Sequence, residues 1–173
     1  MSIRHAVALT TDLIEEAGFS PEVTSEMLRL EDGIQQAVDS AVETILWSTT
    51  ADVKVLDDGT VVPADEDADA SWSSLNFSAA DVSFTSITSV TAEVIYFVGS
   101  NLSDILAYVD SPIPGDAAWS RLGHDLVLTR GRHGAGFRDR GLGDLGDRLT
   151  DACHAYGDFD VSYDIDAGEI CIF

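Results

Sequence analysis

The chain is short and strongly acidic, with 173 residues, 45% of them hydrophobic, and a formal net charge of −22 from 31 acidic and nine basic side chains. Disordered chains combine high charge with low hydrophobicity, so this composition predicts a single folded α+β domain over residues 1–173. The charge excludes the basic surface that direct nucleic-acid binding needs, and no apolar run reaches the ~18 residues that span a membrane.

Residues 1–20 form a short amphipathic segment, which we expect to be loosely attached to the domain. Asp12, Glu15 and Glu16 lie where a secretion signal has its apolar stretch. We therefore expect no signal peptide here.

Residues 21–47 are predicted to form a helix or a helix pair, which can break at Gly33. The order Ser20-Pro21-Glu22 is typical of a helix start, with an N-cap serine, proline at the first helical position and an acid in the first turn. Apolar residues then recur at helical spacing as far as Leu46. Trp47 is interpreted as a core anchor at the end of this helix.

The middle of the chain is predicted to be mixed. Val53–Val55 and Val61-Val62 flank Asp58-Gly59, a pattern that predicts a short hairpin. Residues 63–71 are expected to form a mobile acidic loop, because their acids lack the spacing of a calcium-binding loop.

Residues 83–91 are rich in Ser, Thr, Ile and Val and are expected to be extended. The apolar residues 91–99 suit either a buried strand or a helix that continues to Val109, and the pattern does not decide between them.

The last third is predicted to contain two hairpins and a helix. His124–Arg130 alternates like a strand, and Ala135–Arg140 is expected to be its antiparallel partner. Residues 145–156 show helical spacing and are followed by Gly157 at the C-cap position. Residues 159–173 read as a C-terminal β-hairpin. Cys153 and Cys171 are interpreted as reduced thiols, since two cysteines make no disulfide framework.

Positive charge is concentrated in one segment. Residues 121–140 carry five arginines against two aspartates, whereas residues 1–120 carry 21 acids against three bases, a net charge of −18. The segment 123–146 is also rich in glycine. It is therefore the candidate site of this sequence.

The residue order of this segment resembles a motif of small, acidic, mainly bacteriophage-encoded proteins that are uncharacterised. The matching stretches are Gly123–Asp125, Leu128–Arg130, His133–Phe137 and Asp139–Arg140. The resemblance implies a phage origin, an accessory role outside the virion and a place in the host cytoplasm, and it implies no reaction. The chain departs from the motif at Arg132 and Arg138, and both departures add positive charge.

The motif has three physical interpretations. In the first it is structural: Asp125 and Asp139 pair with Arg130, Arg138 or Arg140 across the hairpin and fix its register. In the second it is a binding site, where arginines and glycine N–H groups hold a phosphate, a nucleotide or a carboxylate. The residues of that binding site are Arg130, Arg132, His133, Gly134, Gly136, Arg138 and Arg140.

The third interpretation is catalysis. His124 and His133 would act as acid–base groups, oriented by Asp125 or Asp139. The sequence has no P-loop ending, no dinucleotide-binding spacing and no nucleophile elbow. No metal-ligand spacing accompanies the histidines either, so we assign no metal and no cofactor. Of the three interpretations, we therefore consider catalysis the least favoured.

Two functions follow. The leading hypothesis is a non-enzymatic phage accessory protein that binds a basic host protein, with its acidic surface imitating nucleic-acid phosphates. The alternative is a small-ligand binder, or an enzyme, centred on Arg130–Arg140. The two are separated by whether the arginines converge on an open pocket or are used in internal salt bridges.

Overall fold

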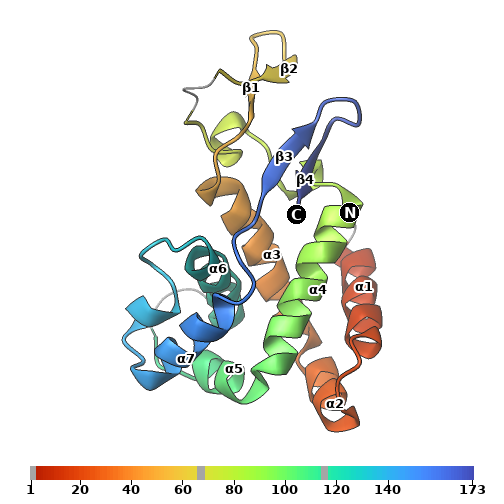
Figure 1. The fold of residues 1–173 in the computed structure, drawn as a ribbon. Helices are drawn as coiled ribbons and strands as arrows, with labels where there is room; N and C mark the ends of the chain where they lie inside the picture. Colours follow the sequence, from red (N-terminus) through yellow and green to blue (C-terminus); the bar gives the residue numbers. More distant parts are fainter. Residues whose placement is uncertain (1–2, 66–68, 114–116) are drawn as a thin grey trace.

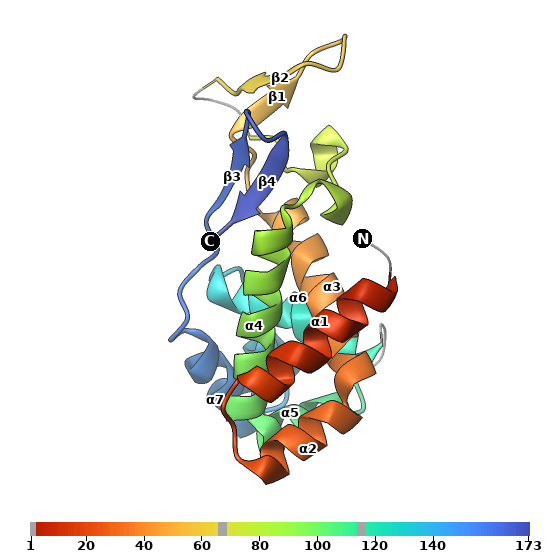
Figure 2. The same cartoon turned by 90° about the vertical axis from the view of Figure 1, so that its right-hand side faces the viewer.

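Two antiparallel hairpins stack at one end of a helical body in this computed structural model, which describes residues 3–65, 69–113 and 117–173 (Figures 1 and 2). The α-helices of the described residues are α1 (Ile3–Glu16), α2 (Pro21–Arg29), α3 (Glu31–Ser48), α4 (Phe84–Ser100), α5 (Leu102–Val109), α6 (Ala118–Arg130) and α7 (Asp144–Cys153). The short 3-10 helices are η1 (Ser73–Leu75), η2 (Ala79–Asp81) and η3 (Phe137–Arg140). The strands are β1 (Val53–Val55), β2 (Val61–Pro63), β3 (Val161–Asp164) and β4 (Glu169–Ile172). The α+β class is therefore confirmed.

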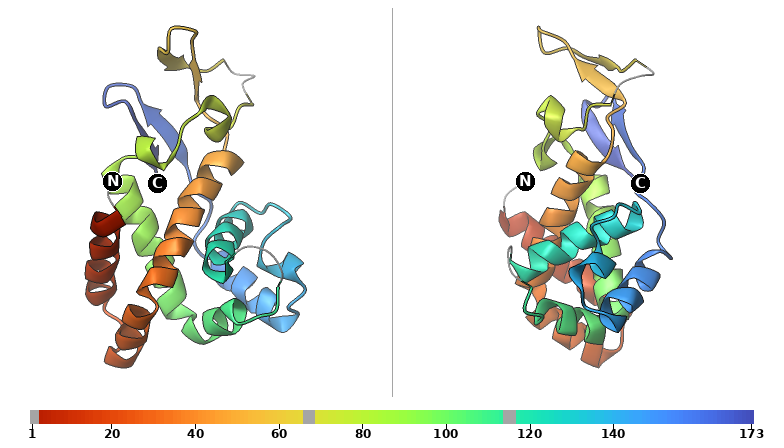
Figure 3. Two further views of the ribbon diagram at one scale, coloured as in Figure 1. Left: turned by 180° about the vertical axis from the view of Figure 1, so that it is seen from behind. Right: turned by 90° about the vertical axis from the view of Figure 1, so that its left-hand side faces the viewer.

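Helix α3 is the central element of the body, with α1 on one side and α6 on the other (Figure 3). The expected helix pair is present, and the Ser20 hydroxyl accepts a hydrogen bond from the Val23 N–H at the start of α2. The break falls at Leu30, whereas Gly33 lies inside α3. The predicted apolar face is buried, from Ile34 to Leu46.

Trp47 is not the core anchor that the sequence suggested, because its residue is 48% exposed. Ile45 and Leu46 already point into the core, and the next residue is turned about 100° further around the helix. Trp47 instead packs beside His124 of α6, with 5.9 Å between the ring centroids.

Residues 83–91 are helical, which corrects the expectation of an extended segment. The Ser83 hydroxyl caps α4 by accepting from the Ser86 N–H. The Thr88 and Thr91 hydroxyls donate back to the carbonyls four residues earlier, so β-branched residues are accommodated in this helix. The apolar residues 91–99, whose type was open, continue the same helix.

The hairpins at Asp58-Gly59 and at residues 159–173 are confirmed. Val53 pairs with Pro63, and Val161 pairs with Ile172. The Tyr163 N–H donates to the Asp52 carboxylate at 3.2 Å and so links the two hairpins. The C-terminal hairpin is also fixed to the start of α4, since the Ile172 N–H donates to the Ser86 hydroxyl at 2.9 Å.

Two further segments that the sequence singled out are residues 1–20 and residues 63–71. Segment 1–20, expected to be loosely attached, contains Ile14, which is fully buried where α1 packs on α3 and α4. In segment 63–71, Lys54 pairs with Asp65 at 2.7 Å, and residues 66–68 lie outside the described part of the chain. No helix in the described residues is both long and apolar enough to cross a membrane.

Candidate functional site

The motif segment is a helix, a turn, a 3-10 helix and a second helix, and not the antiparallel hairpin that its sequence pattern suggested. His124–Arg130 is the second half of α6, and Ala135–Arg140 leads through a turn into η3. Leu126, Val127 and Leu128 are all buried, because α6 packs against α3 on one side and α7 on another. A helix that is covered all round loses the one-sided pattern that would identify it, and a short stretch of it then resembles a strand.

Two motif glycines allow close packing. A Cβ at Gly123 would lie 1.9 Å from the Ala37 carbonyl oxygen, so α6 crosses α3 in close contact there. A Cβ at Gly136 would lie 2.0 Å from the Thr129 Oγ1, which accepts the Phe137 N–H at 3.1 Å. Gly134 is exposed with open space around its Cα. Gly136 therefore has a packing role where the sequence suggested a ligand contact.

Asp125 is the centre of a buried ionic network. Its carboxylate is fully buried and accepts from Arg140, at 2.7 Å from Nε and 2.5 Å from the terminal nitrogen. The Tyr108 hydroxyl donates to it at 2.5 Å, and the His124 Nδ1 lies 3.1 Å away. The hydrogen bond to Asp125 raises the pKa of Arg140, while burial and the same carboxylate raise the pKa of Tyr108. Arg140 is therefore used in a structural ion pair, which joins η3 to α6.

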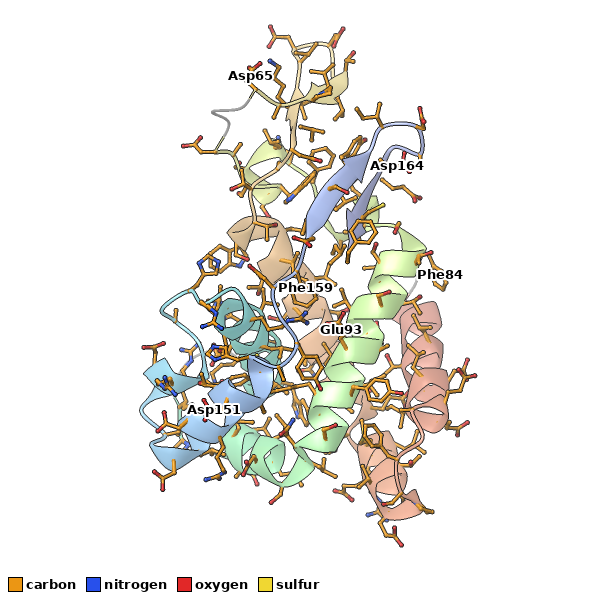
Figure 4. The ribbon with its side chains drawn as sticks, in the orientation of Figure 1. Asp65, Phe84, Glu93, Asp151, Phe159 and Asp164 are labelled. Atoms are coloured by element: carbon orange, nitrogen blue, oxygen red, sulfur yellow. The ribbon has the colours of Figure 1, made fainter. Side chains whose placement is uncertain are left out.

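Arg130 is likewise used inside the molecule. Its guanidinium pairs with Glu93 on α4 and donates from Nε to the Gly157 carbonyl at 2.6 Å. It lies 3.6 Å from the centroid of the Phe159 ring. Figure 4 shows Glu93 and Phe159 facing this region from α4 and from the connector between α7 and β3. With its side chain only 3% exposed, Arg130 has no surface to offer a ligand.

The structure separates the two histidines of the catalytic interpretation. His124 is one third exposed and lies between the buried Asp125 and Trp47. His133 is exposed in the turn after α6. Asp139 is exposed and lines the same small pocket as His133, whereas Asp125 is fully buried.

Several of the remaining candidate binding residues line a small pocket of about 200 Å³. Arg132, with φ of +55° in the left-handed region, lines it together with His133 and Arg138. Arg138 also pairs with Asp147 at 2.7 Å, in an exposed ion pair. The full lining is Thr129, Arg132, His133, Gly136, Phe137, Arg138, Asp139, Thr150 and His154. His154 was missed at the sequence level, where only its neighbour Cys153 was considered as a partner.

The cysteines are free thiols, as expected. Cys153 is buried in α7 and its thiol donates to the Leu126 carbonyl at 3.3 Å. Burial raises the pKa of the Cys153 thiol to about 12, so the reactive thiolate is scarce at neutral pH. Over the described residues, no group of three His, Cys, Asp or Glu side chains is arranged to hold a metal ion.

Comparisons of the chain with protein-family models, with curated proteins and with solved structures found no match.

Proposed function

We propose that this chain is a non-enzymatic phage accessory protein that binds a basic host protein in the host cytoplasm through its acidic surface. The phage origin rests on the motif resemblance around Gly123–Arg140. The binding mode rests on one structural observation, which concerns where the few positive charges are used.

Most of the described basic side chains are neutralised within the molecule. Arg130 and Arg140 are used by Glu93 and Asp125, as described above. Basic residues in ion pairs with carboxylates are Arg29, Lys54, Arg130, Arg138, Arg140 and Arg148. With 31 acidic residues in the chain and Arg132 exposed without an ion pair to a described residue, the surface charge that remains is mostly carboxylate. Such a field attracts basic partners and suits imitation of nucleic-acid phosphates.

The test is capture on the immobilised protein from a bacterial lysate, with poly-glutamate beads as the control for charge alone. We expect capture of basic nucleic-acid-binding proteins that the control beads do not retain. They should be released between about 0.1 M and about 1 M NaCl, as the screening length falls from about 10 Å to about 3 Å. Imitation of phosphates further predicts that a captured protein cannot hold DNA at the same time. Capture of nothing beyond the poly-glutamate set contradicts the proposal.

The second candidate is an anion binder at the pocket of Arg132, His133, Arg138 and His154. It is supported by the convergence of these side chains on one hollow, although Arg138 is shared with Asp147. Titration with inorganic phosphate, followed by the ring NMR signals of His133 and His154, tests it. Saturable shifts that Arg132→Ala abolishes are expected, and unmoved ring signals would reject this candidate.

A further inference from the structure

A groove of about 580 Å³ lies at the hairpin end of the helical body. We call it the α3–α4 groove. Val38 and Val42 of α3, with Val82 and Ile87 around the start of α4, give it an apolar floor. Phe84 stands at its edge and is 63% exposed, and Figure 4 shows its ring projecting from the first turn of α4.

The rim of this groove is acidic on both sides. Asp39 and Glu43 line it from successive turns of α3, and Glu169 lines it from β4. No lysine or arginine is among its described lining residues. Among the residues that the structure describes, Glu43 and Glu169 form no ion pair, and Asp39 accepts a hydrogen bond from the neutral Gln35 amide, at 2.8 Å.

One of these acids is placed against a like charge. Glu169 is the direct partner of Asp164 across the β3–β4 ladder, and the Asp164 carboxylate accepts hydrogen bonds from the Asp166 and Ala167 N–H groups of the turn. Like charges in directly opposed positions destabilise a hairpin, and an incoming cation relieves that repulsion. The apolar floor and the carboxylates therefore favour the same kind of occupant, one that brings both apolar and cationic side chains.

We propose that the α3–α4 groove binds a short amphipathic, basic helix of the host partner. Apolar side chains of that helix pack against Phe84 and Ile87, and its lysines or arginines reach Glu43 and Glu169. The volume is within the range of sites that bury a few side chains, as in helix-in-groove recognition. A second copy of this chain suits the groove poorly, because it carries a net charge of −22 itself. The inference rests on the proposed function, since it specifies where and how the basic partner binds.

The experiment selects peptides from a displayed library of random 12-residue sequences on the whole protein. We expect enrichment of sequences that combine leucine-like residues with lysine or arginine. Binding of a selected peptide is then measured by fluorescence anisotropy. The variant Glu43→Lys/Glu169→Lys should weaken that binding by about tenfold or more. Ala80→Trp, an exposed lining position, should block the groove without changing its charge.

The matched control is Glu16→Lys/Asp57→Lys, which places the same charge changes at two exposed positions away from the groove, at the end of α1 and in the β1–β2 turn. Both double variants change the net charge from −22 to −18, so they differ only in where the charge is altered. We expect the control to bind the selected peptide within about threefold of the unaltered protein, because salt screens charges that lie far from the groove. Circular dichroism verifies that each variant is folded.

The outcomes separate the groove from the wider proposal. If basic peptides or captured host proteins bind both double variants and Ala80→Trp equally, the groove assignment is wrong and the acidic-surface proposal stands. If selection yields no binder, or only neutral or acidic ones, the basic helix is rejected. If the lysate capture also retains nothing beyond the poly-glutamate control, both proposals fail.

Discussion

At the scale of single residues, the most constrained group is the Asp125 carboxylate. It has no exposed surface, and its partners among the described residues are the Arg140 guanidinium, the Tyr108 hydroxyl and the His124 ring. A buried ion pair adds little net stability compared with apolar packing, but removing one partner leaves an uncompensated charge. Asp125 therefore determines where η3 lies against α6.

Replacement of Asp125 tests this network. We expect Asp125→Asn to lower the free energy of unfolding by about 3 kcal/mol, because the partly buried Arg140 guanidinium, whose side chain is 30% exposed, loses its counter-charge. Urea denaturation measures the loss. The control is Arg138→Ala, whose exposed pair with Asp147 should be worth less than about 1 kcal/mol. Equal losses in the two variants would show that the Asp125 network is no more than a surface pair.

The two thiols should differ in reactivity. Cys153 is fully buried with a raised pKa, whereas Cys171 is partly exposed on β4. A colorimetric thiol reagent at mildly alkaline pH should label Cys171 in the native protein and reach Cys153 only after unfolding. Rapid labelling of both thiols in the native state would mean that α7 opens readily.

At the scale of elements, the crossing of α6 over α3 depends on Gly123. Its Cα lies so close to the α3 backbone that the obstructing atom for any side chain is the Ala37 carbonyl oxygen, which cannot rotate away. We expect Gly123→Ala to cost about 3 kcal/mol or more, at or above the upper end of overpacking effects. Thermal denaturation measures it against Gly134→Ala, where space is open and little change is expected. A similar melting temperature for both variants would contradict the close crossing.

The pair of Asp104 on α5 and Arg148 on α7 gives a pH-dependent link between elements. The Arg148 guanidinium binds both carboxylate oxygens, at 2.9 and 2.8 Å, and holds the pKa of Asp104 below its ordinary value of 3.8. Because the folded-state pKa is lowered, the link contributes stability above the unfolded pKa and loses it as pH falls through the folded pKa. The pair is partly exposed, so its contribution should stay below about 1 kcal/mol.

A comparison of Asp104→Asn with the unaltered protein isolates this contribution. The difference in unfolding free energy should be present at neutral pH and should shrink toward zero as pH falls below 3.8. Urea denaturation across that range measures it. A difference that persists unchanged in acid would mean that Asp104 acts through packing rather than through its charge.

The elements that could be predicted from the sequence are those with local signals. Ser20-Pro21 marks the start of α2, and Asp58-Gly59 marks the turn of the β1–β2 hairpin. The errors at residues 83–91 and at His124–Arg130 share one cause, since both helices are rich in β-branched or evenly apolar residues and are covered on several sides. There tertiary packing overrides local propensity.

For the candidate site, one of the three sequence interpretations paired aspartates and arginines of the motif across a hairpin. Asp125 does pair with Arg140, but it does so between α6 and η3. The partner of Arg130 could not be predicted, because Glu93 lies 37 residues away on another helix. His154 joined the small pocket for the same reason: only the folded chain brings α7 beside η3. The acidic α3–α4 groove is lined by residues of α3, α4 and β4, which lie far apart in the sequence, so no local sequence pattern could predict it.

At the scale of the whole molecule, the net charge of −22 acts against compactness. Self-repulsion of this kind weakens as salt screens it, so the folded state should gain stability with ionic strength. We expect the melting temperature to rise with added NaCl, by about 2–4 °C for each kcal/mol of repulsion relieved. The variant Glu16→Lys/Asp57→Lys, with its smaller net charge, should show a smaller rise. A melting temperature that falls with salt would mean that internal ion pairs outweigh the repulsion.

The position of Arg130 has a consequence for the kinetics of folding. Its guanidinium joins Glu93, which lies 37 residues before it, to Gly157, which lies 27 residues after it. Helical domains usually fold fast because their contacts are local, and rates fall as contacting residues lie further apart in the chain. Here α4, α6 and the connector before β3 must all be in place before this side chain has both of its partners. We therefore expect the domain to fold more slowly than its helix content suggests, which stopped-flow refolding from urea would measure.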